Sequence, residues 1–280
     1  MKNGFRTILV PVDFSINSEV AIKKAIELSE RGTLIHLLNV QLNLGLWASS
    51  SKYFVEDASN SNDDMVDQKM DEWKWAIEAS GSSLTVCTWI SFDNSVHEGI
   101  EKKAGSLKPD LIIIGKNSHH CWLPFLNTVV SSKIAERTGV PVLTIKPGSW
   151  YSKIKKVIVP VTSQSLQHKK EIISTLCDKY NVQVHLVTFM DENKPSDFQA
   201  SSLLEFYQWM TRSIQCSVEY TVLHGHNRAK EILNYADKIK ADLLLVHPKT
   251  ETRIGWLNRQ ISDVLPADSK LQVLAVQRTG

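Results

Sequence analysis

The segment around Gly115 carries the residues best suited to binding an anion. A strand-like apolar run, residues 111–114, leads directly into Gly115, and a loop and then a helix-like segment follow. Backbone N–H groups at the start of a helix have no partner within the helix, so they attract phosphates. Glycine at such a position lets the backbone approach the phosphate closely. This order of elements therefore indicates a phosphate-binding position after the strand.

The same loop also holds side chains that could ligate a metal ion, namely His119, His120 and Cys121. Three adjacent residues cannot easily all reach one ion, and no CxxC or HxxxH pair lies nearby. We therefore interpret these residues as loop surface or as a contact with another protein, and we expect no metal.

Other catalytic patterns are absent or misplaced. No Walker-type GxxxxGK[ST] segment is present, and no nucleophile–base pair or pair of carboxylates stands out. The sequence His224-Gly225-His226 is similar to the HxGH signature of adenylyltransferases, but its spacing differs and it follows a third strand rather than the first. His36 and His185 occupy equivalent positions in two strands, where we expect a structural role. The sequence therefore favours a protein that is not an enzyme.

The composition excludes several classes of protein. Of the 280 residues, 42% are hydrophobic and 22% are charged, which is typical of a globular protein. The formal net charge is +2, so the charge gives no indication that the chain binds nucleic acid or a membrane. No apolar run reaches the roughly 18–20 residues that span a bilayer, and the N-terminal run is too short for a signal peptide. The four cysteines are dispersed without a CxxC pair, so we expect reduced thiols and a cytoplasmic location.

The chain contains an internal repeat. Residues 7–13, TILVPVD, match residues 156–162, KVIVPVT, and further along KPDLIIIG at 108–115 is similar to KADLLLVH at 240–247. We therefore predict two domains, 1–148 and 149–280, separated by a Pro/Gly/Ser-containing hinge over residues 146–153.

Within the first copy, short apolar runs alternate with segments of helical periodicity. Strands are expected at 8–12, 34–40, 84–91, 110–114 and 141–145, and helices at 17–31, 65–79, 96–104 and 130–136. Gly32 is expected to end the first helix, and residues 198–214 to form the long helix of the second copy.

This alternation predicts an α/β fold in which each domain is a five-stranded parallel sheet with helices on both faces. Ligands of such sheets bind beyond the carboxyl ends of the strands. We therefore expect Asp13, Val40 and the loop after Gly115 to meet at one edge of the first sheet.

Three segments, ILVPVDFS, DLIIIG and VVSSKIAERTGVPVLTIKP, resemble the universal stress protein family, and the repeat resembles its tandem form. The resemblance implies a Rossmann-like fold of the adenine-nucleotide alpha-hydrolase type, with sheets paired through their last strands. It also implies an intramolecular pseudo-dimer, a homodimer as a further assembly, and a protein partner that the sequence does not name.

Nucleotide-binding members of that family use an aspartate after the first strand for the adenine and ribose. They wrap the phosphates with a glycine-rich loop after the fourth strand. The matching positions in this chain are Pro11, Val12, Asp13, Val40, Gly115, Ser118, Thr128, Val129, Val130 and Ser131. Ser118 and Thr128 replace glycines, and Val129 replaces a small hydroxyl residue, so each adds bulk where backbone should approach phosphate. The resemblance therefore implies weak binding of ATP or another adenine nucleotide in the first domain.

The second copy departs further from the family's pattern. Thr162 replaces the aspartate, His247 and Thr250 replace the first two glycines, and Arg259-Gln260 stand at the third glycine and its neighbour. We expect no nucleotide in this domain and a mainly structural role.

Three functions follow from these observations. The leading one is a stress-response regulatory or ligand-sensing protein. The alternative is a protein-interaction scaffold without a small ligand, indicated by bulky loops and by aromatic residues on the long helices: Trp73, Trp75, Phe206, Tyr207 and Trp209. A third, nucleotide hydrolysis, rests only on the family's ATP-binding members.

Asp13 also has a structural interpretation, because an aspartate after a strand can cap the following turn.

Overall fold

The computed structural model describes residues 4–42, 58–80, 84–116, 130–161, 166–189, 197–225, 227–248, 253–254, 259–261 and 265–277. The strands of the first half are β1 Phe5–Pro11, β2 Ser29–Leu42, β3 Thr85–Asp93, β4 Leu111–Gly115 and β5 Val142–Ile145. Its helices are α1 Ile16–Leu28, α2 Ala58–Ala79, α3 Val96–Leu107 and α4 Ser131–Thr138. The second half has strands β6 Lys156–Pro160, β7 Gln183–Phe189, β8 Ser217–Leu223, β9 Leu243–Val246 and β12 Gln272–Ala275. Its helices are α5 Leu166–Lys179, α6 Asp197–Ser213 and α7 Arg228–Ile239, and β10 Arg253–Ile254 pairs with β11 Arg259–Gln260.

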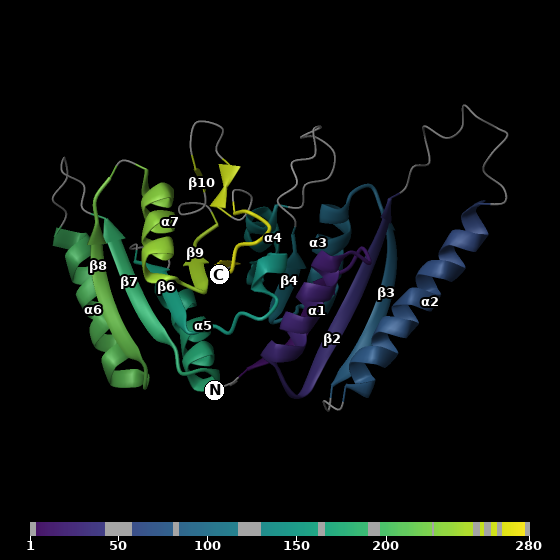
Figure 1. The fold of residues 1–280 in the computed structure, drawn as a ribbon, viewed down its shortest axis with the longest axis horizontal. Helices are drawn as coiled ribbons and strands as arrows, with labels where there is room; N and C mark the ends of the chain where they lie inside the picture. Colours follow the sequence, from purple (N-terminus) through teal and green to yellow (C-terminus); the bar gives the residue numbers. More distant parts are fainter. Residues whose placement is uncertain are drawn as a thin grey trace.

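The ten main strands form one continuous sheet in the order β3-β2-β1-β4-β5-β12-β9-β6-β7-β8 (Figure 1). Neighbouring strands within each half are parallel, which confirms the predicted parallel arrangement. The halves meet where β5 pairs with β12 antiparallel, with Thr144 opposite Val273 and Val142 opposite Ala275. The last strand of each half therefore joins the two five-stranded arrangements edge to edge.

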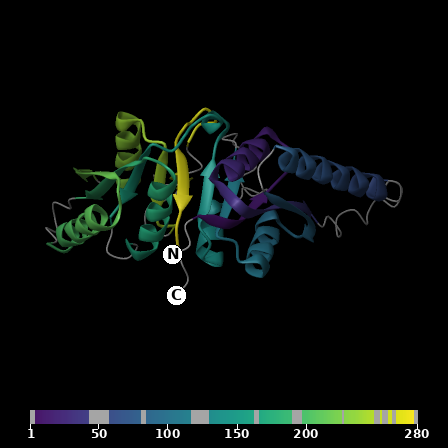
Figure 2. The same ribbon diagram turned by 90° about the horizontal axis from the view of Figure 1, so that it is seen from below.

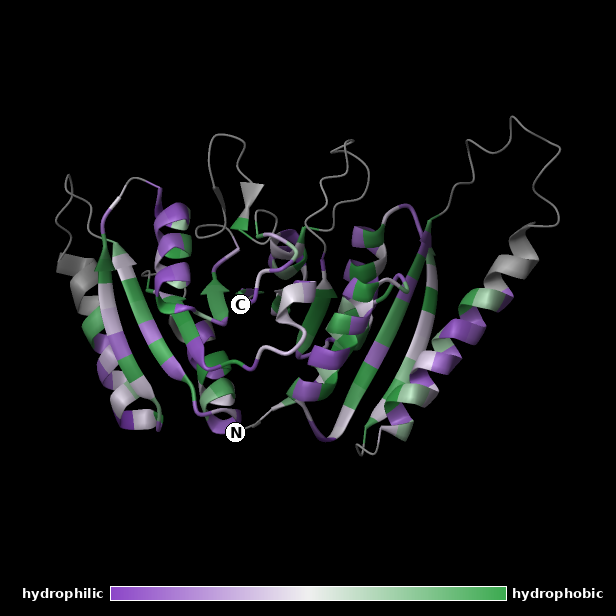
Figure 3. Cartoon of the chain, viewed as in Figure 1, coloured by the Kyte–Doolittle hydropathy of each residue, from purple (hydrophilic) through white to green (hydrophobic). Residues whose placement is uncertain are grey.

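Helices cover both faces of this sheet (Figure 2). One buried apolar cluster contains side chains of α1, α2, α5 and α6, and the other contains side chains of α3, α4 and α7. Successive strand residues alternate between them, as when Ile8 and Val10 lie in the first cluster and Leu9 in the second. Apolar residues accordingly fill β9 and all of β4 before Gly115 (Figure 3), as expected for strands buried on both faces.

The sequence repeat reappears as repeated hydrogen bonds. Asp110 Oδ2 accepts from two backbone N–H groups at the start of β1, each at 3.0 Å, and Asp242 Oδ2 accepts from the two at the start of β6, each at 2.9 Å. Lys108 and Lys240 end α3 and α7 in the same left-handed conformation, with φ of 47° and 54°. We propose that the two halves are the repeated domains 1–148 and 149–280.

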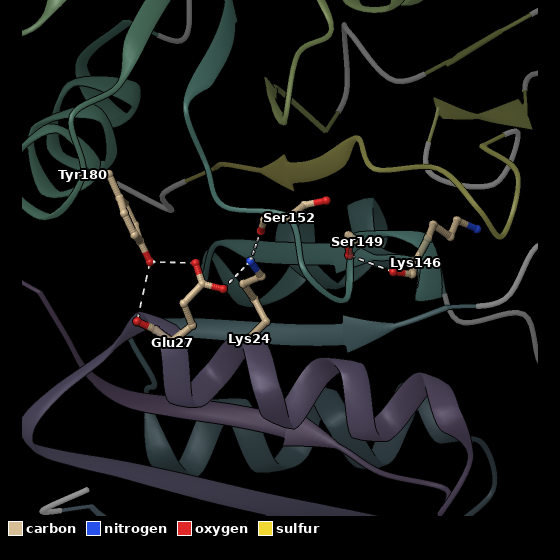
Figure 4. A network of polar contacts seen from close by, with 6 residues as sticks. All are labelled: Lys24, Glu27, Lys146, Ser149, Ser152 and Tyr180. Carbon is tan, nitrogen blue, oxygen red and sulfur yellow. Dashed lines mark hydrogen bonds and ion pairs between the residues drawn. The ribbon is translucent and has the colours of Figure 1, made fainter.

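Polar contacts tie α1 of the first half to the connecting segment and to the end of α5 (Figure 4). The buried Lys24 Nζ lies 2.6 Å from Glu27 Oε2 and donates to the carbonyl of Ser152 at 2.9 Å. Tyr180 donates from its hydroxyl to Glu27 Oε1 at 3.1 Å, and Lys179 Nζ donates to the carbonyl of Ser29 at 2.8 Å. The connecting segment is therefore packed between the halves.

The predicted end of the first helix is wrong. Helix α1 ends at Leu28, because Ser29 turns to extended backbone and its hydroxyl donates to the carbonyl of Ala25 at 2.6 Å. Gly32 instead lies within β2, with φ of 85°. The segment after Ser29 is held to β1 by Thr33, whose hydroxyl donates to the carbonyl of Phe5 at 2.9 Å. These side-chain bonds favour the strand over a further helical turn.

Strand β11 consists of Arg259 and Gln260, and it pairs with β10. In the internal repeat, these two residues correspond to the third glycine of the family's loop and its neighbour.

Among the described segments, none of the helices combines the length and the hydropathy that a bilayer crossing requires.

Candidate functional site

The expected edge forms where β2, β1 and β4 end side by side. Pro11 is the last residue of β1, and Val12 follows it with its N–H donating to the carbonyl of Leu38 at 2.8 Å. The buried side chain of Asn39 donates to the carbonyl of Val12 at 2.9 Å. The backbone that leads into Asp13 is therefore fixed by its neighbouring strand.

Asp13 is exposed, and it also organises the turn into α1. Its Oδ1 accepts from the backbone N–H of Ser15 at 3.1 Å, from the Ser15 hydroxyl at 2.5 Å and from the Ser18 hydroxyl at 2.6 Å. Partial burial by itself would raise the pKa of Asp13, but the hydrogen bonds from Ser15 and Ser18 outweigh it and the pKa is lowered. Asp13 is thus an anion at neutral pH. Within the described residues, its second oxygen, Oδ2, accepts no hydrogen bond.

Gly115 ends β4, where the first turn of α1 crosses it. A β-carbon at this position would lie 1.8 Å from the carbonyl oxygen of Asn17 and 2.4 Å from its carbonyl carbon. Contacts this short cannot be relieved by a side-chain rotation, since both atoms belong to backbone. Gly115 is therefore required by the packing of α1 on β4, whether or not a ligand binds beside it.

Val40 is half-buried on β2, beside the start of α3. A β-carbon on Gly99 would lie 2.8 Å from both γ-carbons of Val40 and 2.9 Å from Asp93 Oδ2. The buried Asp93 carboxylate is paired with Lys102 Nζ at 2.6 Å. Val40 therefore forms an apolar part of the edge that α3 holds closely in place.

The start of α4 has partners within the protein for two of the predicted phosphate contacts. The N–H of Val130 donates to His97 Nε2 at 2.8 Å. Ser131 is buried, and its hydroxyl accepts from the Thr144 hydroxyl at 2.7 Å. The Val130 N–H is then not available to a phosphate without a local rearrangement, and burial keeps the Ser131 hydroxyl from solvent.

His97, on the first turn of α3, is held neutral. Burial lowers its pKa, and the positive charges of Lys133, Arg137 and Lys116 lower it further against the opposing effect of Glu101. Lys116 and Lys133 thus place positive charge near His97, which itself contacts the start of α4, and positive charge favours an anion. The predicted residues Ser118, Thr128 and Val129 lie outside the described residues, as do His119, His120 and Cys121. In the remainder, no three His, Cys, Asp or Glu side chains gather as a metal site would require.

The first half of the chain matches a known protein family. The model of the universal stress protein family matches residues 4–146. This chain belongs to the universal stress protein family. The match covers the first half, including Asp13, Gly115 and the start of α4. No curated protein sequence matches the chain significantly.

Solved structures share the fold of this universal stress protein over both halves. A universal stress protein from Archaeoglobus fulgidus DSM 4304 is 19% identical, with a TM-score of 0.71 and 100% of each chain covered. A functionally unknown protein from Pseudomonas aeruginosa PAO1 is 17% identical, with a TM-score of 0.58, covering 99% of this chain and 94% of that one. A putative universal stress protein from Pseudomonas aeruginosa UCBPP-PA14 is 16% identical, with a TM-score of 0.55 and coverages of 98% and 94%. At these identities the likeness concerns the fold.

The second half of this universal stress protein has a buried lysine at the equivalent edge. Lys169 on α5 is fully buried, and its Nζ donates to the carbonyl of Pro160, the last residue of β6, at 2.6 Å. Val161 is the repeat counterpart of Val12. Its backbone N–H donates to the carbonyl of Val187 at 2.8 Å, just as that of Val12 donates to the carbonyl of Leu38. His247 follows β9 as the repeat predicts, whereas Thr162 and Thr250 lie outside the described residues.

Neither Lys169 nor His97 is predicted from the sequence. Lys169 occupies the repeat position of Val20, so a charged residue within an apolar helical face is a signal that could have found it. For His97 no sequence signal exists, because its partner Val130 is joined to it only by the packing of α4 against α3.

The two strand histidines of the universal stress repeat have similar roles. His36 accepts at Nδ1 from the indole N–H of Trp89 at 3.0 Å, and His185 Nδ1 lies 3.1 Å from the Tyr235 hydroxyl. Both rings are buried, and burial lowers the pKa of each. Their contacts support the structural role expected from the sequence.

We expect His36, His97 and His185 to make the folded state less stable at acid pH. The pKa values of His36, His97 and His185 lie below the ordinary 6.5 in the folded state, so the unfolded chain binds more protons as the pH falls. Their stabilising contribution is complete above pH 6.5 and is lost as the pH falls through the folded-state pKa values. Each pH unit between the folded and unfolded pKa corresponds to about 1.4 kcal/mol.

Urea unfolding at pH 7.5 and pH 5.5 measures this effect. We expect a lower midpoint at pH 5.5, and a smaller drop for His97→Gln, because glutamine still offers an acceptor to Val130 but does not titrate. Equal midpoints for the wild type at the two pH values would contradict the assignment.

Proposed function

We propose that this universal stress protein is a regulatory, ligand-sensing protein that binds an adenine nucleotide weakly at the edge of its first half. The observation that carries the proposal is Asp13, an exposed carboxylate whose Oδ2 has no partner in the described part of the chain. A carboxylate oxygen accepts hydrogen bonds, so it suits the hydroxyl groups of a ribose.

The phosphates would lie toward the start of α4. Lys116 and Lys133 bring positive charge there, as their effect on His97 indicates, and the helix start favours an anion. Binding is weak in this proposal because the Val130 N–H already donates to His97 and the Ser131 hydroxyl is buried. The bulk of Ser118, Thr128 and Val129, expected from the sequence, acts in the same direction.

We propose that the second half binds no nucleotide and serves mainly to complete the ten-stranded sheet as a pseudo-dimer. At the equivalent edge of the second half, the buried ammonium group of Lys169 donates a hydrogen bond to the carbonyl of Pro160. No catalytic turnover is proposed for either half. A homodimer of the whole chain stays a prediction.

Thermal unfolding with and without ATP tests this function. A ligand that binds the folded state at ten times its dissociation constant stabilises it by about 1.4 kcal/mol, which corresponds to about 2–4 °C in Tm for a chain of this size. We expect millimolar ATP to raise the Tm of the wild type, and to raise that of Asp13→Ala much less. Thr162→Ala, at the equivalent position of the second half, is the matched control and should respond like the wild type.

A protein-interaction scaffold is the second candidate, and exposed aromatic side chains favour it. Trp75 on α2 is 73% exposed, and Phe92 on the outer strand β3 is 56% exposed. Exposed aromatic residues are common anchors of protein interfaces. The two candidates separate in the same assay, because a scaffold without a small ligand shows no ATP-dependent change in Tm for the wild type.

A further inference from the structure

The imidazole of His97 binds a backbone donor at the start of α4. Its Nε2 accepts at 2.8 Å from the N–H of Val130, which is the N-cap residue of that helix. An imidazole nitrogen accepts a hydrogen bond only when it carries no proton. The contact therefore requires a neutral His97 with its proton on Nδ1, and Nε2 takes the place that a phosphate oxygen would take on this N–H.

Burial and neighbouring charges keep this imidazole neutral. Burial is the main reason that the pKa of His97 lies below the ordinary 6.5. Lys133 and Arg137 on α4 and Lys116 after β4 lower it further. Glu101 on α3 acts in the opposite direction, and its carboxylate is paired with Arg137 Nη1 at 3.2 Å. A phosphate anion beside these cations would offset their charge and would favour a proton on His97.

We propose that protonation of His97 releases the Val130 N–H and makes the edge of the first half a pH-dependent binding site for polyphosphate anions. This inference rests on the proposed function, since it concerns the same edge. A proton on Nε2 places two donors 2.8 Å apart, so the imidazolium and the N–H have to separate. The released N–H can donate to a phosphate oxygen, and the imidazolium adds a positive charge near it.

The direction of the pH effect follows from the coupling between the two ligands, proton and anion. The anion binds more tightly to the form with protonated His97, so the bound anion raises the pKa of His97. Affinity is constant above the pKa of the bound form and rises as the pH falls through it. The phosphates themselves lose negative charge over the same range, since the second pKa of a phosphate ester is about 6. Tighter binding at acid pH therefore has its origin in the protein.

Nuclear magnetic resonance of the full chain with isotope-labelled valine tests the release of Val130. Its amide cross-peak is followed without ligand from pH 7.5 to pH 5.0. We expect the cross-peak to move with a midpoint below pH 6.5, because the loss of a hydrogen bond changes the amide shift. In His97→Gln it should not titrate. His185→Gln replaces another buried histidine, in the second half, and is the matched control that should titrate like the wild type.

Inorganic tripolyphosphate is the ligand probe, because it carries the phosphates of ATP without adenine or ribose. We expect it to bind the wild type about tenfold more tightly at pH 5.5 than at pH 7.5, which corresponds to a rise of about one unit in the pKa of His97 on binding. The Val130 cross-peak should respond to the probe at pH 5.5. The affinity of His97→Gln should not rise at acid pH.

The two measurements separate this inference from the proposed function. If tripolyphosphate binds in this pH-dependent way and ATP does not bind, the nucleotide proposal fails and the role of His97 is supported. The inference is overturned if the Val130 cross-peak of the wild type does not titrate, or titrates equally in His97→Gln. It is also overturned if tripolyphosphate binds the wild type no more tightly at pH 5.5 than at pH 7.5, or not at all. Both tests on the wild type hold even if His97→Gln fails to fold.

Discussion

Replacement of Gly115 by alanine is expected to destabilise the protein by about 3 kcal/mol, the upper end of the cost of overpacking a well-packed site. The added β-carbon would lie 1.8 Å from the Asn17 carbonyl oxygen, and relief requires the start of α1 to move away from β4. That movement would also shift Ser18, which holds Asp13 through a 2.6 Å hydrogen bond. The same substitution should therefore weaken both the fold and the proposed nucleotide site.

Urea unfolding of Gly115→Ala and Gly105→Ala measures the effect. Gly105 lies within α3, and a β-carbon there would meet no atom within 4 Å. Alanine at such a helical position is expected to stabilise by about 0.5–1 kcal/mol. The two glycine variants should thus change stability in opposite directions. Equal unfolding midpoints would show that α1 does not rest on β4 as described.

Truncation of Phe206 to alanine is expected to cost about 3–5 kcal/mol, the range for removing a fully buried aromatic ring. Phe206 on α6 is 1% exposed, and its ring centroid lies 5.5 Å from that of Trp209. It belongs to the apolar cluster that includes side chains from both halves of the sheet. Its loss should therefore lower the stability of the protein as a whole.

Leu204→Ala is the matched control, because Leu204 lies on the same helix and is 55% exposed. Its replacement should change the free energy of unfolding by no more than about 0.5 kcal/mol. Chemical denaturation followed by circular dichroism compares the two variants. Similar midpoints for Phe206→Ala and Leu204→Ala would contradict the assignment of the α6 face that packs on the sheet.

The arrangement of strands and helices could be predicted from sequence because local periodicity decides it. Runs such as residues 111–114 are apolar at every position, and this pattern requires burial on both faces of a sheet. The end of α1 could not be predicted in the same way. It depends on the bond from Ser29 to Ala25 and on the pairing of Thr33 with β1, and glycine at position 32 suggested a different end.

The candidate site was predictable in position but not in detail. The motif placed Asp13, Val40 and Gly115 at adjoining strand ends, where the structure also has them. It could not indicate that Gly115 is required by Asn17, or that Ser131 bonds to Thr144, because these contacts arise between distant elements.

The central claim is that one adenine nucleotide binds per chain, at Asp13 in the first half. Isothermal titration of ATP into the wild type, Asp13→Ala and Thr162→Ala tests it most directly. We expect one weak site per chain in the wild type and in Thr162→Ala. Asp13→Ala should weaken binding at least about tenfold, since a hydrogen bond to a charged group contributes about 1.5–3 kcal/mol. No heat with millimolar ATP, or equal affinity for Asp13→Ala and the wild type, would contradict the claim.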